Sequence, residues 1–279
     1  MLLVYGIGIY SLINAQDYQP DIHKLVHLQG SKPLITGHRG GFYAQLPENS
    51  LAAFNYTLQN ACDLPVILEL DIKVNRGGNL YVFHDDSLQR CSNGQGKIAE
   101  ASDDYLKSLF LKNQSGEITS ESIPTFDSVL SFAKNKNVVF MLDVKANIWE
   151  KVILAIKKHD MESQVIILTF KDEHSRLVYQ LAPDCMISVL IPDEKAWKNV
   201  LTLGIPFENL IAYISSNTPL SLILEIEKNN IPLMTDVSEH KNKYTNPLPE
   251  DFYKELVQKN HLDILISDFP VEVAAIFCN

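Results

Sequence analysis

Two carboxylates share one face of an apolar strand in residues 66–86, VILELDIKVNRGGNLYVFHDD. Side chains along a strand alternate between its two faces, so Glu69 and Asp71, two positions apart, project to the same side. Carboxylates placed together on an apolar strand repel each other and lose hydration. The arrangement therefore indicates a bound cation. The alternative, a solvated pair at a sheet edge, does not suit the apolar flanks.

A third carboxylate, Asp143, ends the apolar run VVFMLDVK. If the three carboxylates converge, their pKa values rise and they destabilise the fold at neutral pH unless a divalent cation binds them. Ligands that are all oxygen atoms favour Mg²⁺ or Ca²⁺ over zinc. Glu69, Asp71 and Asp143 are therefore the predicted ligands of Mg²⁺ or Ca²⁺. For Asp143, a helix N-cap or an ion pair with Lys145 is the alternative.

Two histidines, His38 and His84, lie at the ends of separate apolar runs. Histidine moves protons near neutral pH, and two histidines on opposite sides of a substrate serve as base and acid. The cationic residues Arg39 and Lys145 add positive charge for an anionic group. A metal, paired histidines and cations together suit the cleavage of a phosphodiester.

The chain alternates apolar runs with amphipathic ones after Pro33. Nine runs resemble buried strands: LITGH, VILELDI, LYVFHD, VVFMLDVK, VIILTF, MISVLI, LIAYISS, IPLMTDV and DILISDF. Helices are expected between them at Ser50–Gln59, Phe126–Lys134, Trp149–His159, Glu173–Ala182 and Leu220–Asn229. Strands that alternate with helices over this length predict an α/β fold, a closed (β/α)₈ TIM barrel.

The ninth run is explained by a hairpin. Too few residues separate LELDI from LYVFHD for a parallel crossover, so the second run is expected to turn back at Gly77-Gly78 and pair with the first. This pairing places Asp71 opposite His84. An insertion at about residues 90–123 follows the hairpin, and we expect it to shape the pocket.

Functional groups of such a barrel belong at the carboxyl ends of its strands. Polar residues occupy those ends, whereas the amino ends carry nothing comparable: His38, Arg39, Glu69, Asp71, Asp143, Lys145, Thr169, Ser215, Asp236 and Asp268. Asp268 has two interpretations, a functional group or the residue that closes the turn before Phe-Pro. Arg39 and Glu48 also have two, a substrate contact with its orienting partner or a purely structural ion pair.

Several motifs in order resemble the glycerophosphodiester phosphodiesterase family. They are ITGHRG, PENSLAAF and LELDIKVNRGGNLYVFHDDSLQR, followed by GQGKI, IPTFDSVL, MLDVKAN, ILTF and DILISDFP. The resemblance runs from about Leu34 to Phe269. It implies a metal-dependent hydrolase that converts glycerophosphodiesters to glycerol 3-phosphate and an alcohol.

The resemblance also implies roles. The histidines of HRG and HD, here His38 and His84, are the catalytic acid and base, and the E-x-D carboxylates bind the metal. Arg39 contacts phosphate and Glu48 orients it. Lys145 also fits a phosphate contact.

Two positions depart from the family pattern. Asp143 stands where a glutamate is common, so the third ligand is one methylene shorter and the preferred ion is open. The late segment LMTDVSEH lacks the Trp of the W-T-x-N pattern, which leaves the head group open. Phe170 of ILTF is expected to supply an apolar wall.

Three other functions remain open. A phospholipase D-like enzyme acting on lysophospholipids or sphingolipids is built on the same barrel. A glycoside hydrolase uses paired carboxylates but needs neither a divalent ion nor two histidines. A non-catalytic phosphate-binding barrel is the third. The formal net charge of −10 argues against a nucleic-acid partner and against an anionic membrane surface, and it leaves a small-molecule glycerophosphodiester as the expected partner.

The first fifteen residues, MLLVYGIGIYSLINA, carry no charge and resemble a secretory signal peptide, so we expect an exported protein, periplasmic or secreted. A buried N-terminal strand or helix is the alternative. Residues 16–279 are expected to form a single domain with no stable membrane span. The four cysteines have no metal-type spacing, and their pairing and the oligomeric state stay open.

Overall fold

The computed structural model describes residues 19–28, 32–62, 66–237, 239 and 244–278. The expected signal peptide, residues 1–15, lies outside these residues. Within them, eight parallel strands form one closed ring. The strands are β1 (Leu34–Gly37), β2 (Val66–Val74), β6 (Val138–Val144), β7 (Val165–Thr169), β8 (Met186–Leu190), β9 (Leu210–Tyr213), β10 (Leu233–Asp236) and β11 (Ile264–Ser267).

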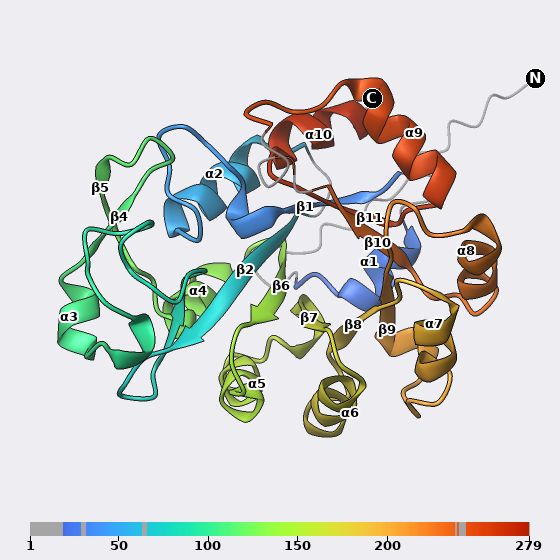
Figure 1. Ribbon diagram of the computed structural model, residues 1–279, viewed down its shortest axis with the longest axis horizontal. Coiled ribbons are helices and arrows are strands. Elements are labelled where there is room, and N and C mark those ends of the chain that lie inside the picture. Colours follow the sequence, from blue (N-terminus) through green and yellow to red (C-terminus); the bar gives the residue numbers. More distant parts are fainter. Residues whose placement is uncertain (1–18, 29–31, 63–65, 238, 240–243, 279) are drawn as a thin grey trace, which may run out of the picture.

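The ring closes at β1, which pairs in parallel with both β11 and β2. Helices surround the strands on the outside (Figure 1). The predicted TIM barrel is therefore confirmed.

Alternation along each strand separates the inside of the barrel from its helix-covered outside. In β2, Ile67 belongs to a cluster that includes Val139 and Ile166 of the neighbouring strands β6 and β7. Leu68 and Leu70 belong instead to the larger cluster that includes residues of the surrounding helices. Glu69 and Asp71 lie on the same face of β2 as Ile67, so both carboxylates point into the barrel above its apolar interior.

A short helix, α1 (Ile22–Leu28), lies at the amino-terminal end of the barrel. Its residues Ile22, Leu25 and Val26 pack into the interior cluster. Both ring nitrogens of His23 lie 3.1 Å from backbone carbonyl oxygens, those of Glu208 and Asp184. These carbonyls precede β9 and β8, so α1 covers the end of the barrel opposite to the predicted site. This helix is not among those expected from the sequence.

The outer helices are α2 (Leu51–Asn60), α4 (Phe126–Ala133), α5 (Trp149–Lys158), α6 (Asp172–Leu181), α7 (Glu194–Val200), α8 (Leu220–Glu227), α9 (Glu250–Asn260) and α10 (Pro270–Phe277). Those predicted from the sequence begin and end within two residues of the expected positions. Caps explain two of the starts, because the Ser50 and Thr125 hydroxyls accept hydrogen bonds from backbone N–H groups of α2 and α4. Within the described residues, no helix is long and apolar enough to cross a membrane.

The predicted hairpin is present. Strand β3 (Leu80–Val82) pairs antiparallel with β2, with Ile72 opposite Val82. The backbone N–H of Phe83 donates to the Asp71 carbonyl at 2.9 Å, so Phe83 rather than His84 lies opposite Asp71. The pairing is one residue away from the expected register.

The insertion after the hairpin has a small core of its own. It contains a 3₁₀ turn (Ile98–Glu100), the helix α3 (Asp103–Lys107) and the antiparallel strands β4 (Phe110–Lys112) and β5 (Ile118–Ser122). Tyr81 and Phe83 of the hairpin belong to this core together with Leu88, Leu106 and Leu111. The insertion therefore packs directly against the hairpin that precedes His84.

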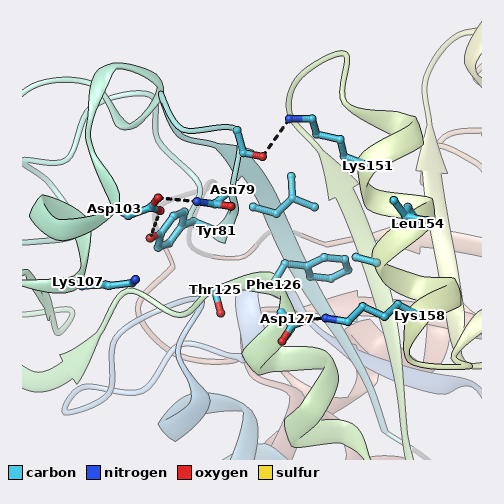
Figure 2. Close-up of a pocket in the computed structure, with 13 residues that line it drawn as sticks. Asn79, Tyr81, Asp103, Lys107, Thr125, Phe126, Asp127, Lys151, Leu154 and Lys158 are labelled. Carbon is cyan, nitrogen blue, oxygen red and sulfur yellow. Dashed lines mark hydrogen bonds and ion pairs between the residues drawn. The ribbon is translucent and has the colours of Figure 1, made fainter.

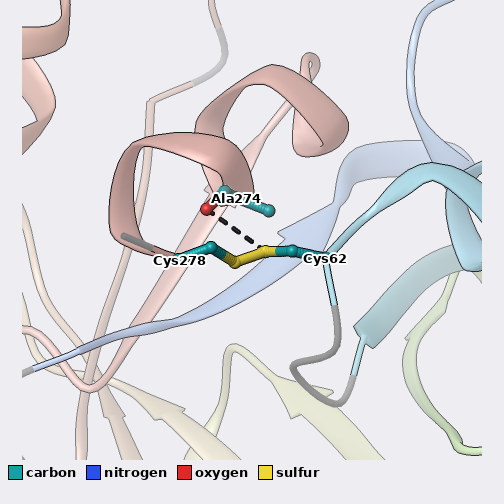
Figure 3. The surroundings of a disulfide bond; sticks show 3 residues. All are labelled: Cys62, Ala274 and Cys278. Atoms are coloured by element: carbon teal, nitrogen blue, oxygen red, sulfur yellow. Dashed lines mark hydrogen bonds between the residues drawn. A yellow bond between two sulfur atoms is a disulfide. The ribbon is translucent and has the colours of Figure 1, made fainter.

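A disulfide bond joins Cys62, after α2, to Cys278, after α10 (Figure 3). Their Cα atoms are 6.4 Å apart, and the sulfur of Cys62 lies 3.4 Å from the Ala274 carbonyl oxygen. Cys91 and Cys185 are free and buried. The pairing that the sequence left open is therefore one disulfide and two thiols within the described residues.

Candidate active site

The predicted metal ligands meet at the carboxyl end of the barrel. Asp71 of β2 and Asp143 of β6 are partners in the parallel register, and Glu69 lies two residues earlier on the same face of β2. Ligand oxygens of all three side chains lie within 4.8 Å of one another. The structure thus brings together Glu69, Asp71 and Asp143, as the spacing in the sequence suggested.

This cluster has the chemistry of a cation site. Burial and the nearby charge of Asp71 raise the pKa of Glu69 to about 8. Burial also opposes the ionisation of Asp71, but the charges of Lys145 and Arg39 outweigh it and lower the pKa of Asp71. A divalent cation would favour the ionised form of all three carboxylates, and the donor set of oxygens alone fits Mg²⁺ or Ca²⁺.

Lys145 supplies positive charge to the same cluster. Its ammonium group forms ion pairs with Asp71 at 2.9 Å and with Asp143. Burial would lower the pKa of Lys145, but the two carboxylates raise it above its ordinary value. The ion pair with Asp143 that the sequence offered as an alternative is therefore present, within reach of the predicted metal ligands.

His38 follows β1 and lies against a buried carboxylate. Its Nδ1 atom is 2.6 Å from Oδ1 of Asp268, whose side chain is completely buried after β11. Burial would lower the pKa of His38, but the hydrogen bond to Asp268 and the charges of Glu69 and Asp268 outweigh it and raise the pKa to about 9. The ring of Phe42 stacks on that of His38, with centroids 6.2 Å apart. His38 is thus fixed on one edge and one face.

His84 comes to the site from the hairpin and has a different carboxylate partner. Its Nδ1 atom is 2.6 Å from Oδ1 of the adjacent Asp85. Arg90, from the insertion, donates to both oxygens of Asp85 at 2.6 and 2.7 Å. The hydrogen bond from Arg90 is the main reason that the pKa of Asp85 lies well below its ordinary value. His84 also helps to lower the pKa of Asp71, so the two residues are close enough to interact.

Arg39 is held by its backbone and its side chain. Its φ of 51° is left-handed, and in this conformation its backbone N–H donates to Glu69 at 2.8 Å. Its guanidinium donates to Glu48 at 3.0 Å and lies 3.6 Å from Asp71. The next residue, Gly40, has φ of 86°, and a Cβ there would lie 2.5 Å from the Phe54 ring. The HRG turn therefore needs its glycine to bring Arg39 against the carboxylates.

Glu48 binds one arginine from each side of the site, Arg39 after β1 and Arg90 from the insertion. Besides Arg39, it accepts hydrogen bonds from Arg90 at 2.8 and 2.9 Å. The neighbouring Asn49 exchanges hydrogen bonds with Asp71, donating to its carboxylate at 2.8 Å and accepting from its backbone N–H at 3.2 Å. The PEN segment thus supports Arg39 and a predicted metal ligand together.

Phe170 lies on the rim after β7 and is 49% exposed. Its ring centroid is 6.5 Å from that of Tyr213, whose hydroxyl lies 3.4 Å from the Asp236 carboxylate. Burial raises the pKa of Tyr213, and the charges of Asp236, Glu69 and Asp143 add to the effect. Tyr213 therefore faces the carboxylate cluster, and with Phe170 it forms an aromatic part of the mouth.

Three supporting residues, Asn49, Asp85 and Arg90, are not predicted from the sequence, and of the two interpretations of Asp268 the structure supports the functional one. Asp268 had a signal in its position at a strand end, and Asp85 had one in its place directly after His84. Asn49 and Arg90 lie within the sequence motifs, but the motifs do not indicate which residues they contact. Their contacts span 22 and 42 residues and become visible only once the barrel has closed.

A separate cavity of about 480 Å³ lies outside the barrel, between the hairpin turn, α4 and α5 (Figure 2). Its lining includes Tyr81, Asp103, Lys151 and Lys158, and none of the predicted site residues. The chemistry described above is therefore not located there.

Comparisons with known proteins agree with the geometry. Residues 38–270 match the model of the glycerophosphoryl diester phosphodiesterase family. A glycerophosphodiester phosphodiesterase of Caldanaerobacter subterraneus is 32% identical over 166 residues, 57% of this chain and 67% of that protein. An uncharacterized protein of Bacillus subtilis is 27% identical over 88% of this chain and 98% of its own length.

Solved structures share the fold. A glycerophosphoryl diester phosphodiesterase from Parabacteroides distasonis superimposes with a TM-score of 0.81 and 26% identity over 92% of this chain and 91% of that one. An Oleispira antarctica phosphodiesterase, solved with the product sn-glycerol-3-phosphate, has the same fold at a TM-score of 0.69 and 18% identity, covering 90% and 98%. The chain described here is thus a phosphoric diester hydrolase and belongs to the glycerophosphoryl diester phosphodiesterase family.

Proposed function

We propose that the protein hydrolyses glycerophosphodiesters to glycerol 3-phosphate and an alcohol, with a divalent cation and two histidines. The observation that carries this proposal is the placement of two histidine–carboxylate pairs, His38–Asp268 and His84–Asp85, beside the cluster of Glu69, Asp71 and Asp143. A general acid and a general base on separate elements are what the cleavage of a phosphodiester requires.

The two rings have the same arrangement. In each, Nδ1 faces a carboxylate, so proton transfer falls to Nε2. One histidine takes the proton from the glycerol hydroxyl next to the phosphate, and that oxygen attacks phosphorus. The other histidine protonates the leaving alcohol oxygen. The cyclic phosphate formed in this step is then opened by water, with the two roles exchanged.

Glu69, Asp71 and Asp143 are the residues that would hold the cation. When bound, Mg²⁺ or Ca²⁺ supplies charge stabilisation to the phosphate oxygens in the transition state. Arg39, held by Glu48, is placed to contact the phosphate. Lys145 now pairs with two of the same carboxylates, and we propose that it turns its charge to the phosphate when the cation is bound.

The test is alcohol release from a panel of substrates. It comprises glycerophosphocholine, glycerophosphoethanolamine, glycerophosphoinositol and lysophosphatidylcholine, each with Mg²⁺, Ca²⁺ or EDTA. We expect turnover of at least one glycerophosphodiester that requires a divalent ion. Turnover of lysophosphatidylcholine alone would favour the phospholipase D-like alternative, and turnover that resists EDTA would contradict the role of the carboxylate cluster.

We also propose that the protein is exported and that residues 16–279 act as one domain. The apolar, uncharged residues 1–15 support export, and so does the Cys62–Cys278 disulfide, because disulfides persist in oxidising compartments. Fractionation of cells that express the full chain, with N-terminal sequencing of the product, tests this. A product retained in the cytoplasm with residues 1–15 attached would contradict it.

A further inference from the structure

A buried carboxylate, Glu239, lies after β10 in the segment that departs from the family pattern. Its side chain is completely buried and accepts hydrogen bonds from three groups of the described residues. The donors are the Tyr253 hydroxyl at 2.7 Å, the Ser267 hydroxyl at 2.6 Å and the backbone N–H of Asp268 at 2.9 Å. Glu239 is therefore bound to the end of β11, at the residue that holds His38.

The backbone of Asp268 is fixed on both sides. Its N–H donates to Glu239, and its carbonyl accepts from the backbone N–H of Phe42 at 2.7 Å. Because the backbone on either side of the side chain is held, the carboxylate has little freedom to turn away from His38. Phe42 also stacks on the His38 ring, so the same residue contacts both members of the pair.

We propose that Glu239 is a positioning residue, which holds the backbone of Asp268 and thereby fixes the orientation of the His38 ring. Glu239 does not touch the reacting atoms. The inference rests on the proposed function, in which His38 transfers a proton. Glu239, which follows β10, thus supports His38 through Asp268.

A matched control lies at the opposite end of the same two strands. The Asp263 carboxylate precedes β11 and accepts a hydrogen bond from the backbone N–H of Leu233, at the start of β10, at 2.7 Å. Glu239 and Asp263 thus each bind the backbone at one end of the β10–β11 pair. Only Glu239 is at the end where His38 lies, so a purely structural role predicts similar consequences for the two alanine variants.

The experiment compares Glu239→Ala, Asp263→Ala and His38→Ala with the wild type. For each we would measure kcat, KM, thermal unfolding and the ¹⁵N resonances of the His38 ring. We expect Glu239→Ala to lower kcat about 10- to 100-fold and to shift the ring resonances, with KM changed less than about threefold. Asp263→Ala should lose thermal stability but keep kcat and the His38 resonances of the wild type.

Glu239→Gln is the conservative variant. Its carbonyl can accept the Asp268 N–H while its amide donates to the two hydroxyls, so kcat should return to within about threefold of the wild type. A folded Glu239→Ala protein with unchanged kcat and unchanged His38 resonances would overturn the proposal. If that variant does not fold, Glu239→Asp decides, because the shorter side chain withdraws from Asp268, and wild-type kcat there would overturn it equally.

The two proposals fail in different ways. Absence of metal-dependent turnover in the wild type, or its survival in His38→Ala, would contradict the proposed function. The ring resonances of the Glu239 and Asp263 variants would still show whether Glu239 orients His38.

Discussion

The two histidines of the site have the same carboxylate contact but are supported by very different parts of the molecule. His38 continues a barrel strand, and its partner Asp268 is completely buried. His84 follows the hairpin, and the side chain of its partner Asp85 is 22% exposed and held by an arginine from the insertion. One pair depends on the closed barrel, and the other depends on packing between the hairpin and the insertion.

The two histidine–carboxylate pairs also differ in their electrostatics. Around His38, burial is outweighed by Asp268 and Glu69, and the pKa of the ring rises to about 9. Around His84, the strongest effect falls on the partner, because Arg90 keeps Asp85 ionised to low pH. A buried pair gains strength from low polarity, whereas a pair near the surface needs a further charged group to hold it.

Removing either ring should have the largest effect. We expect His38→Ala and His84→Ala each to lower kcat/KM by about 10²- to 10⁴-fold, since each removes one partner in proton transfer. Steady-state kinetics with the preferred glycerophosphodiester measures this, with thermal unfolding as the check on folding. Near-normal turnover in one of the two would assign both proton transfers to the other ring.

The next largest effect should separate the two partners. Asp268→Asn is expected to lower kcat about 100-fold. The side chain is fully buried, so water cannot compensate for the negative charge that is lost beside His38. Asp85→Asn should lower kcat only about tenfold, since water can reach this partly exposed position and replace part of the lost interaction with His84. The ratio of the two kcat values is the measurement. Equal losses would show that burial does not distinguish the pairs.

Arg90 offers a smaller and more selective disturbance. Arg90→Gln removes the hydrogen bonds to Asp85 and Glu48, and we expect kcat/KM to fall about tenfold. Because the Arg90 side chain is 49% exposed, this contribution should also weaken as NaCl increases. Arg76→Gln is the control, since Arg76 is an exposed cation of the hairpin turn. A loss of the same size in Arg76→Gln would mean that only the overall charge matters.

The smallest effect concerns stability at the amino-terminal end of the strands. Burial raises the pKa of Asp263 from 3.8 to about 6, although the hydrogen bond from Leu233 and the charges of His27 and His261 act in the opposite direction. The folded protein binds this proton more tightly than the unfolded chain, so stability is lost as pH rises from about 4 to 6.

Asp263→Asn should therefore be more stable than the wild type at pH 7, by about 1–3 kcal/mol, and equal to it near pH 4. Urea unfolding at the two pH values measures the difference. A variant that is less stable at pH 7 would show that the negative charge is needed for the hydrogen bond to Leu233.

The sequence predicts those parts of the site that depend on local alternation. Glu69 and Asp71 share a face because of strand geometry, and the short Gly77-Gly78 connection predicts the hairpin. The contact of His38 with Asp268 spans 230 residues and exists only because β1 closes against β11. No local pattern distinguishes that contact from a turn-closing aspartate.

Two further features, the helix α1 and the contact of Glu239, were not predicted for the same reason. The helix α1 is short, and its apolar residues find their place only at the end of a finished barrel. Glu239 lies in the late segment that lacks the Trp of the W-T-x-N pattern, and nothing in that pattern indicates that its side chain binds the end of β11. The positions of α1 and of the Glu239 side chain both depend on contacts that exist only after the barrel has closed.

The disulfide makes a covalent ring of most of this molecule. Cys62 and Cys278 are separated by 216 residues, and every barrel strand except β1 lies between them. A single protease cut in any loop of that interval would give two fragments that stay linked, migrating together without reductant and apart after reduction. A cut between Arg39 and Cys62 would instead leave a piece with no covalent link to the rest of the protein, and that piece would carry β1, His38 and Arg39.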